Sequence, residues 1–220
     1  MINKKEIIKV IKIINKEVKK FRNPIVTRIG QELNDPYKVL ISCLISLRTK
    51  DDVTAKASKK LFAKADSPEK MIKLNENYIG KLILPANYYK TKAKNIKEIS
   101  KILINEYNGR VPETREELMK LPGVGPKTSA IVMTYGYLKN NFIPVDVHCH
   151  RIPNRLGWIK TKTPEETEKS LMKIIPRKYW QMLNNNFVTF GQNICLPVSP
   201  YCSKCPVRKY CKRVNVKHSR

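Results

Sequence analysis

The sequence predicts an all-α protein, and three observations support this prediction. Apolar residues recur three and four positions apart along most of the 220-residue chain, which is the spacing of one helix face. Helix-start signals also recur, either as a polar residue before proline or as threonine with glutamate three residues later. No run of alternating polar and apolar residues is long enough to indicate a β-sheet.

The first two predicted helices differ in how much of their surface is apolar. The N-terminal helix has a single apolar face, formed by Ile7, Ile8, Ile11, Ile14 and Val18. In the second helix, Asp35 is the expected N-cap and Pro36 the first-turn proline. This helix is apolar on nearly every side through Leu47, so we expect most of it to be buried.

Three helices are predicted in the middle of the chain. Residues 51–63 carry an apolar stripe formed by Val53, Ala57 and Leu61. Ser67 before Pro68 starts a short helix, and residues 90–107 form a longer amphipathic one.

Two capping boxes mark further helix starts. They consist of Thr114 with Glu117, and of Thr163 with Glu166. Loops are expected between the helical segments, at residues 22–35, 108–113 and 195–213.

The composition is strongly basic. Lysine and arginine outnumber aspartate and glutamate by 44 to 18, which gives a formal net charge of +26. Such an excess favours a polyanionic partner, with nucleic acid first and an anionic membrane surface second. The alternative is that the lysines serve only solubility.

Neither a signal peptide nor a membrane span is indicated. Charged residues interrupt every turn of the N-terminal segment. The longest apolar run, residues 39–47, includes two serines and is about half the length of a membrane span. We therefore expect a soluble protein of the reducing cytoplasm.

Four cysteines lie close together near the C-terminus, with the spacing Cys195-x6-Cys202-x2-Cys205-x5-Cys211. A loop this short can wrap one inorganic centre, and four thiolates suit either an iron–sulfur cube or a zinc ion. Only one pair has the two-residue spacing of a zinc knuckle, which favours the iron–sulfur cluster. Disulfides are least favoured because nothing indicates secretion.

A tight hairpin is predicted at residues 121–128, LPGVGPKT, between two helical stretches. Gly123 and Gly125 allow unusual backbone geometry and let the main chain approach a ligand closely. Pro126 then fixes the first turn of the next helix. Main-chain amides at such a position bind anions, and with the basic charge a DNA phosphate is favoured. The alternative is an ordinary helix–helix connection.

The hairpin and the cysteine loop together resemble the helix-hairpin-helix DNA glycosylases, specifically the endonuclease III family. The resemblance covers about residues 25–211 and includes residues 47–51, 89–96 and 145–148. It implies two domains around a cleft. Residues 25–139 would form a six-helix barrel containing the hairpin, and residues 1–24 and 140–220 a domain that holds a 4Fe-4S cluster through the four cysteines.

Two residues are the candidate catalytic groups. Lys127 lies in the first turn of its predicted helix, where the helix dipole disfavours an ammonium and favours the amine that can attack. The resemblance implies that Lys127 is the nucleophile and Asp146 the catalytic carboxylate. The alternatives are a solvated lysine that contacts phosphate, and an N-cap aspartate for a helix over residues 147–156.

The resemblance implies a bifunctional DNA glycosylase and abasic-site lyase in base excision repair. Such an enzyme extrudes an oxidised pyrimidine, removes it, and cleaves the strand by β-elimination through a lysine Schiff base. Its partner is double-stranded DNA with a damaged base or an abasic site, and the family implies a monomer associated with the nucleoid. Two alternatives stay open: a mismatch glycosylase for uracil or thymine opposite guanine, and a non-catalytic DNA-binding protein that senses redox state.

The chain departs from the family beside the predicted gap left by the extruded base. Arg48 replaces a glutamine, and because a guanidinium only donates hydrogen bonds, we expect it to favour an orphaned guanine. The alternative is an arginine that pins a phosphate. Tyr88 replaces an apolar wedge and could stack on exposed bases. Asn87 replaces a glycine and tolerates positive φ.

The remaining expectations concern histidine and cysteine. His148 lies beside the catalytic carboxylate of the family, where it organises the start of a helix. Cys43 and Cys149 lie in apolar surroundings and are expected to be core thiols. Arg151 could face either DNA or solvent. The complete set of expected DNA-binding residues is Gly123, Val124, Gly125, Arg48, Tyr88, Thr128 and His148.

Overall fold

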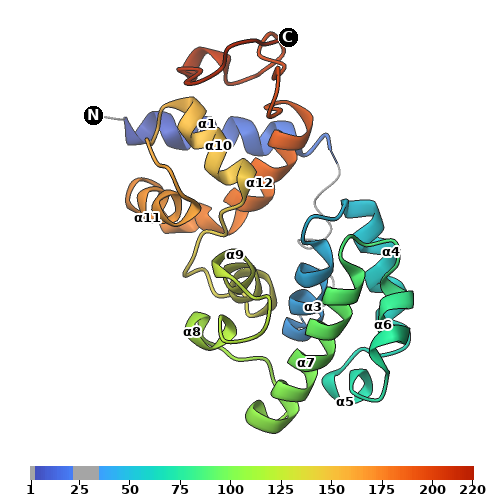
Figure 1. Cartoon of the computed structure of the whole chain (residues 1–220). Helices are drawn as coiled ribbons and strands as arrows, with labels where there is room; N and C mark the ends of the chain where they lie inside the picture. Colours follow the sequence, from blue (N-terminus) through green and yellow to red (C-terminus); the bar gives the residue numbers. More distant parts are fainter. Residues whose placement is uncertain (1–2, 22–34) are drawn as a thin grey trace. The chain divides into compact units, whose positions relative to one another are not determined.

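The computed structural model describes residues 3–21 and 35–220, and every regular element among them is helical (Figure 1). The predicted all-α fold class is therefore confirmed. The chain divides into two compact units. Unit 1 comprises Met1–Pro24 and Asn140–Arg220, and unit 2 comprises Ile25–Lys139.

Unit 2 is built around one buried helix, α3 (Pro36–Ser46), which contacts α4, α7 and α9 (Figure 1). The predicted start of α3 is confirmed, because Asp35 Oδ1 accepts a hydrogen bond from Lys38 N at 3.1 Å. The other elements of unit 2 are α4 (Asp51–Phe62), α5 (Pro68–Met71), α6 (Glu76–Ile83), α7 (Tyr89–Tyr107), α8 (Arg115–Leu118), α9 (Pro126–Ile131) and a π-helical turn (Val132–Gly136).

Two details of unit 2 differ from the predictions. Helix α6 was not predicted, although Asn75 caps it through a hydrogen bond from Tyr78 N at 2.8 Å. On α4 the buried stripe includes Thr54, whereas Val53 is only half-buried. Thr54 can be buried because its hydroxyl donates to Lys50 O at 3.1 Å, which satisfies the polar group.

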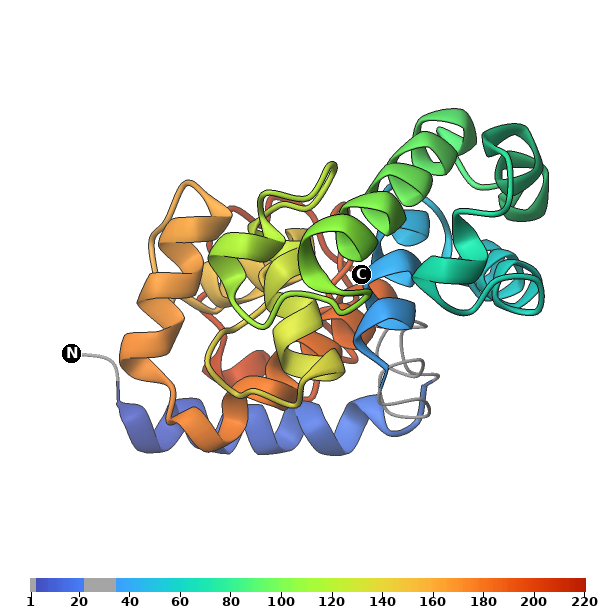
Figure 2. The same cartoon turned by 90° about the horizontal axis from the view of Figure 1, so that it is seen from below.

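Unit 1 joins the N-terminal helix to the C-terminal part of the chain. Helix α1 (Lys4–Val18) lies beside α12 (Trp180–Asn193), as both views show (Figures 1 and 2). Helix α12 also packs against α10 (Val147–Leu156), which in turn contacts α11 (Pro164–Ile174). Short 3-10 turns complete the unit at Arg177–Tyr179 and Arg208–Tyr210.

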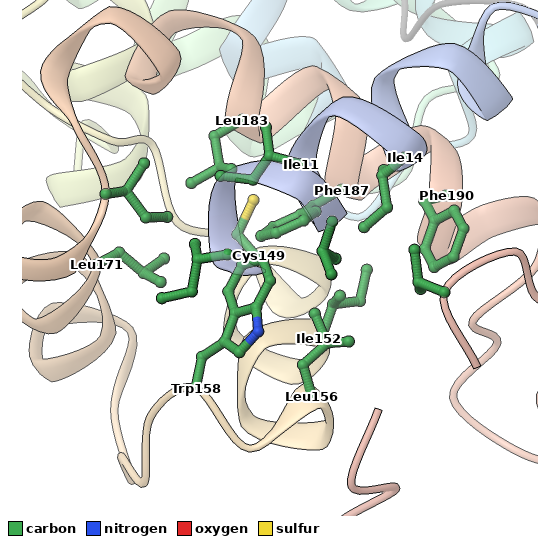
Figure 3. Packing of buried hydrophobic residues seen from close by; sticks show 14 of the residues in the cluster. Ile11, Ile14, Cys149, Ile152, Leu156, Trp158, Leu171, Leu183, Phe187 and Phe190 are labelled. Atoms are coloured by element: carbon green, nitrogen blue, oxygen red, sulfur yellow. The ribbon is translucent and has the colours of Figure 1, made fainter. Parts of the chain in front are cut away.

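The core of unit 1 combines residues from both ends of the sequence. Figure 3 shows Ile11 and Ile14 of α1 beside Phe187 of α12 and Trp158, which follows α10. The predicted face of α1 needs one correction. Val10 is fully buried whereas Ile8 is only half-buried, because the helix turns position 10 toward α12. Burial of this face stabilises the contact between α1 and the rest of the unit.

The predicted capping and loop positions are largely confirmed. Thr114 Oγ1 accepts from Glu117 N at 3.3 Å, and Thr163 Oγ1 from Glu166 N at 3.2 Å. The loops at residues 108–113 and 195–213 are present, the second with one 3-10 turn. The predicted loop at residues 22–35 lies almost entirely outside the described residues. Within residues 3–21 and 35–220, none of the helices combines the length and apolarity needed to cross a bilayer.

Candidate active site and cysteine centre

The hairpin between α8 and α9 uses its two glycines in different ways. Gly123 has φ +78°, and a Cβ at this position would lie 2.7 Å from Asn95 Nδ2. Only glycine fits there without strain. Gly125 has an ordinary extended backbone, and a Cβ there would meet nothing within 4 Å. The space beside the Gly125 Cα, where a side chain would lie, is therefore open.

Lys127 lies in the first turn of α9, one residue after Pro126, and its side chain is exposed. No side chain caps α9, whose N-cap residue is Gly125. The turn is held from within instead, because Ser129 N donates to Gly125 O at 3.0 Å. Arg115 of α8 also donates from Nη2 to Pro126 O at 3.2 Å. The lysine therefore stands on a fixed turn with its side chain directed to the surface.

Two of the predicted DNA-binding residues in this hairpin are buried. Val124 is 6% exposed and Thr128 is 4% exposed. Their side chains belong to the interior of unit 2, so any contact they make with DNA has to come from the main chain. The predicted DNA contacts of Val124 and Thr128 are therefore restricted to their backbone atoms.

Asp146, in unit 1, is the N-cap of α10, as the alternative interpretation of this residue predicted. Its Oδ1 accepts hydrogen bonds from His148 N and Cys149 N, both at 2.9 Å. These bonds use two of the amides that the first turn of a helix leaves without partners. The carboxylate is half-buried and is held in one orientation by the helix that it caps.

The ring of His148 is fixed by its neighbours in unit 1. Arg151 Nη2 lies 3.0 Å from His148 Nδ1. A Cβ on Gly191 would lie 2.2 Å from the same nitrogen, so a glycine is needed there to make room for the imidazole. The predicted role of His148 in organising the start of α10 is consistent with this packing.

Two arginines of α10 connect this helix to the cysteine loop, a feature that the sequence did not reveal. Arg151 Nη2 donates to Cys195 O at 2.7 Å, and burial lowers the pKa of Arg151. Arg155 donates from Nη1 to Leu196 O and from Nη2 to Pro197 O, both at 2.6 Å. The i, i+4 spacing of the two arginines on one helix face was the signal that could have indicated a common partner.

The four predicted ligand cysteines line one cavity in unit 1. Burial, with a smaller contribution from the nearby thiols of Cys195, Cys211 and Cys202, raises the pKa of Cys205 to about 11. In the described part of the chain, no three His, Cys, Asp or Glu side chains are placed to hold a single metal ion. The four thiols are thus gathered around one space without converging on one point.

The other two cysteines are core thiols, as predicted. Cys43 is 2% exposed and Cys149 is fully buried. Burial raises the pKa of Cys43 to about 12, so this thiol is not a nucleophile at neutral pH. Asn184 Nδ2 donates to Cys149 Sγ at 3.4 Å, which ties α10 to α12.

Arg48 and Tyr88, 40 residues apart in the sequence, contact each other in unit 2. Arg48 Nη1 donates to Tyr88 Oη at 3.5 Å, and the guanidinium carbon lies 5.8 Å from the centroid of the ring. Both residues are in the left-handed backbone region, with φ 53° and 56°. The prediction for Asn87 was wrong in one respect, because the left-handed residue of this turn is Tyr88. Asn87 donates from Nδ2 to Arg48 O instead.

Comparisons with known proteins agree with these features. Residues 41–177 match the family model described as HhH-GPD superfamily base excision DNA repair protein. Endonuclease III of Thermotoga maritima is 48% identical over 178 residues, covering 81% of this chain and 83% of the relative. A solved structure of a trapped endonuclease III–DNA covalent intermediate has a TM-score of 0.83 and 32% identity, with 97% of each chain covered. The structure of a thermostable thymine-DNA glycosylase has a TM-score of 0.80 and 28% identity, with 96% of each chain covered.

Proposed function

Because the chain belongs to the endonuclease III family of HhH-GPD base excision DNA repair proteins, we propose that it is a bifunctional DNA glycosylase and abasic-site lyase. Its substrates are oxidised pyrimidines in double-stranded DNA. One observation carries the proposal: an exposed lysine follows the hairpin, in a chain similar along almost its whole length to a protein trapped covalently on DNA.

Lys127 is the proposed nucleophile. Its uncharged Nζ attacks C1′ of the damaged nucleoside, and the base leaves with the electron pair of the glycosidic bond and takes up a proton. Loss of the ammonium proton and opening of the C1′–O4′ bond then give a Schiff base, with the ring electron pair retained by O4′. Removal of a C2′ proton expels the 3′ phosphate and cleaves the strand. Water finally hydrolyses the imine and releases Lys127.

Asp146 is the proposed carboxylate of this reaction. An anion stabilises the positive charge that develops on the sugar as the base departs. It also accepts the proton that the attacking nitrogen loses. Two amide hydrogen bonds to Oδ1 support this role, because they fix where the carboxylate lies.

Binding of DNA is proposed to use the hairpin main chain together with the net charge of +26. The open space beside the Gly125 Cα supports contact with a phosphate, which fixes position without reading sequence. In this proposal unit 2 is the barrel domain, unit 1 is the cluster domain, and the protein acts as a monomer at the nucleoid.

A 4Fe-4S cluster is the proposed cofactor of the cysteine loop. The family generally carries one, and the four thiols around one cavity suit four irons that each take one thiolate. A single zinc ion would need all four sulfurs at about 2.3 Å. When bound, the cluster supplies cross-links that close the loop formed by residues 195–211. The thiolates of Cys195, Cys202, Cys205 and Cys211 would hold it.

A mismatch glycosylase acting opposite guanine is the second candidate. It is favoured by Arg48, which presents only donors to an orphaned base, and by the similarity to a thymine-DNA glycosylase. The two candidates share fold and cofactor and differ in the base that is removed. Duplexes that contain one oxidised pyrimidine, uracil or thymine, each opposite guanine or adenine, distinguish them by initial rates of base release.

Borohydride trapping on abasic duplex DNA tests the enzyme against a non-catalytic DNA-binding protein. We expect a covalent complex with the intact chain and none with Lys127→Ala. Lys120→Ala is the matched control, because it removes an exposed lysine directly before the hairpin and should leave trapping intact. No trapping by the intact, DNA-binding protein would favour the non-catalytic alternative.

A further inference from the structure

Lys92 is a buried lysine with a complete set of partners. It lies on α7 and is 6% exposed. Its Nζ donates to Ile45 O and Leu47 O, both at 2.7 Å, and to Thr49 Oγ1 at 2.8 Å. An ammonium has three donors, and here each of them has an acceptor. The acceptors all belong to the end of α3 and the turn that follows it, so Lys92 fixes the turn that carries Arg48.

Thr49 connects this turn to a second one. Its Oγ1 also accepts a hydrogen bond from Asn87 N at 3.2 Å. Asn87 in turn donates through its side chain to Arg48 O. The turn of Arg48 and the turn of Tyr88 are thereby joined through both side-chain and main-chain atoms. We call the joining residues Lys92, Thr49 and Asn87 the clasp.

The clasp holds two backbone conformations that are unfavourable by themselves. A non-glycine residue in the left-handed region is strained, and unit 2 has one at each of the two joined turns, Arg48 and Tyr88. Such conformations persist only where the surroundings determine them. The side chains nevertheless remain at the surface, where Tyr88 is 62% exposed. The clasp therefore fixes two exposed side chains relative to each other.

We propose that Lys92 and Thr49 are positioning residues that hold Arg48 and Tyr88 as one preassembled reader of the base opposite the lesion. This inference rests on the proposed function and extends it to specificity. Arg48 would donate to the acceptor atoms of an orphaned guanine while the ring of Tyr88 stacks beside it. A reader that is ordered before binding loses less conformational entropy on contact, so discrimination between guanine and adenine increases.

A second lysine of α7 serves as a matched control, because it also donates hydrogen bonds to main-chain carbonyl groups. Lys97, also on α7, donates from Nζ to Ile72 O at 3.0 Å and to Leu74 O. It fixes a turn that carries neither Arg48 nor Tyr88. If the lysines of α7 that donate to main-chain carbonyl groups serve only stability, substitution of Lys92 and of Lys97 should have the same consequence for activity.

The experiment compares Lys92→Met, Thr49→Val and Lys97→Met. For each folded variant, kcat/KM for release of an oxidised pyrimidine is measured opposite guanine and opposite adenine. Lyase activity on a single-stranded abasic oligonucleotide, which has no opposite base, is measured in parallel. We expect the guanine-to-adenine ratio to fall by roughly fivefold or more in Lys92→Met and Thr49→Val. Lys97→Met should keep the ratio of the intact chain, and all three should keep single-strand lyase activity.

The outcomes distinguish failure of the positioning role from failure of the proposed function. A ratio near one in the intact chain, or a ratio unchanged in both Lys92→Met and Thr49→Val, overturns the positioning role. Failure of the intact chain to form the borohydride-trapped complex on abasic duplex DNA overturns the proposed function instead. Thr49→Val keeps the ammonium and nearly the same side-chain shape, so it decides the question even if Lys92→Met does not fold.

Discussion

The starts of α9 and α10 carry the two proposed catalytic groups and are built in opposite ways. Helix α9 begins after Gly125 with no side-chain cap, and its lysine is exposed. Helix α10 begins at Asp146, whose carboxylate caps the first turn itself. The amides at the start of α10 bind the Asp146 carboxylate, whereas no side chain caps the start of α9. The comparison indicates that the proposed catalytic group also stabilises its own helix at α10 but not at α9.

Loss of one of the four loop cysteines should have the largest effect on stability. We expect this effect to be confined to unit 1, which contains α10. We expect Cys202→Ser to abolish the absorbance of the proposed 4Fe-4S cluster in the violet region of the spectrum. It should also lower the free energy of unfolding of unit 1 by about 3 kcal/mol, as for a cross-link over a loop of similar length. Arg151 and Arg155 tie this loop to α10, so amides of α10 should exchange faster with solvent. An equal increase in the amide exchange rate of α9 would contradict the predicted difference between the two helices.

Substitutions of the two hairpin glycines test the predictions for the start of α9. Gly123→Ala places a side chain at φ +78° and should cost about 1–2 kcal/mol of stability. Gly125→Ala meets open space and should leave stability within about 0.5 kcal/mol while weakening DNA binding. Urea unfolding and DNA titration at fixed salt measure the two effects. Equal loss of stability in both variants would contradict the contrast between these positions.

Two substitutions at Asp146 separate charge from capping. Asp146→Ala removes both, so activity should be lost and stability should fall by about 1 kcal/mol. Asp146→Asn keeps an oxygen that can cap, so we expect lost activity with nearly normal stability. Thermal unfolding and single-turnover lyase assays measure the two quantities. Full activity in Asp146→Asn would exclude a role for the negative charge.

The predicted effect of Lys92 on stability depends on pH and has the opposite sign to that of Asp146, because here burial of a charge opposes folding. Burial lowers the pKa of Lys92 from 10.5 to about 8. Between these values the unfolded chain binds more protons than the folded chain, so the free energy of unfolding rises with pH. The intact chain should gain stability relative to Lys92→Met as pH increases through this window. Urea unfolding on both sides of pH 8 tests this, and a constant difference would contradict it.

Local signals account for what the sequence predicted well. Asp35 with Pro36 and Thr163 with Glu166 act within one turn of their helices, so their effect is visible in a few adjacent residues. Helix α6 was missed because its buried face is only two turns long and its start lacks a proline or a capping box. Short apolar runs of this kind do not determine their own structure.

Tertiary contacts account for what the sequence left out. Lys92 stands in a lysine-rich segment and is indistinguishable there from a solvated lysine. Its partners are carbonyl groups at the end of another helix, and only the packed structure brings them together. The contact of Arg48 with Tyr88 has the same origin. The catalytic roles of Lys127 and Asp146 came from the family resemblance, and they stay predictions.

The packing of α1 against α12 has a consequence for how the protein is made. Unit 2 is one continuous stretch of chain and can fold as soon as it leaves the ribosome. The apolar face of α1 emerges earlier but has to wait for α12, which is synthesised only after the whole of unit 2. During that interval the apolar face of α1 is exposed on the nascent chain. A chaperone that binds exposed apolar segments would therefore bind α1 first.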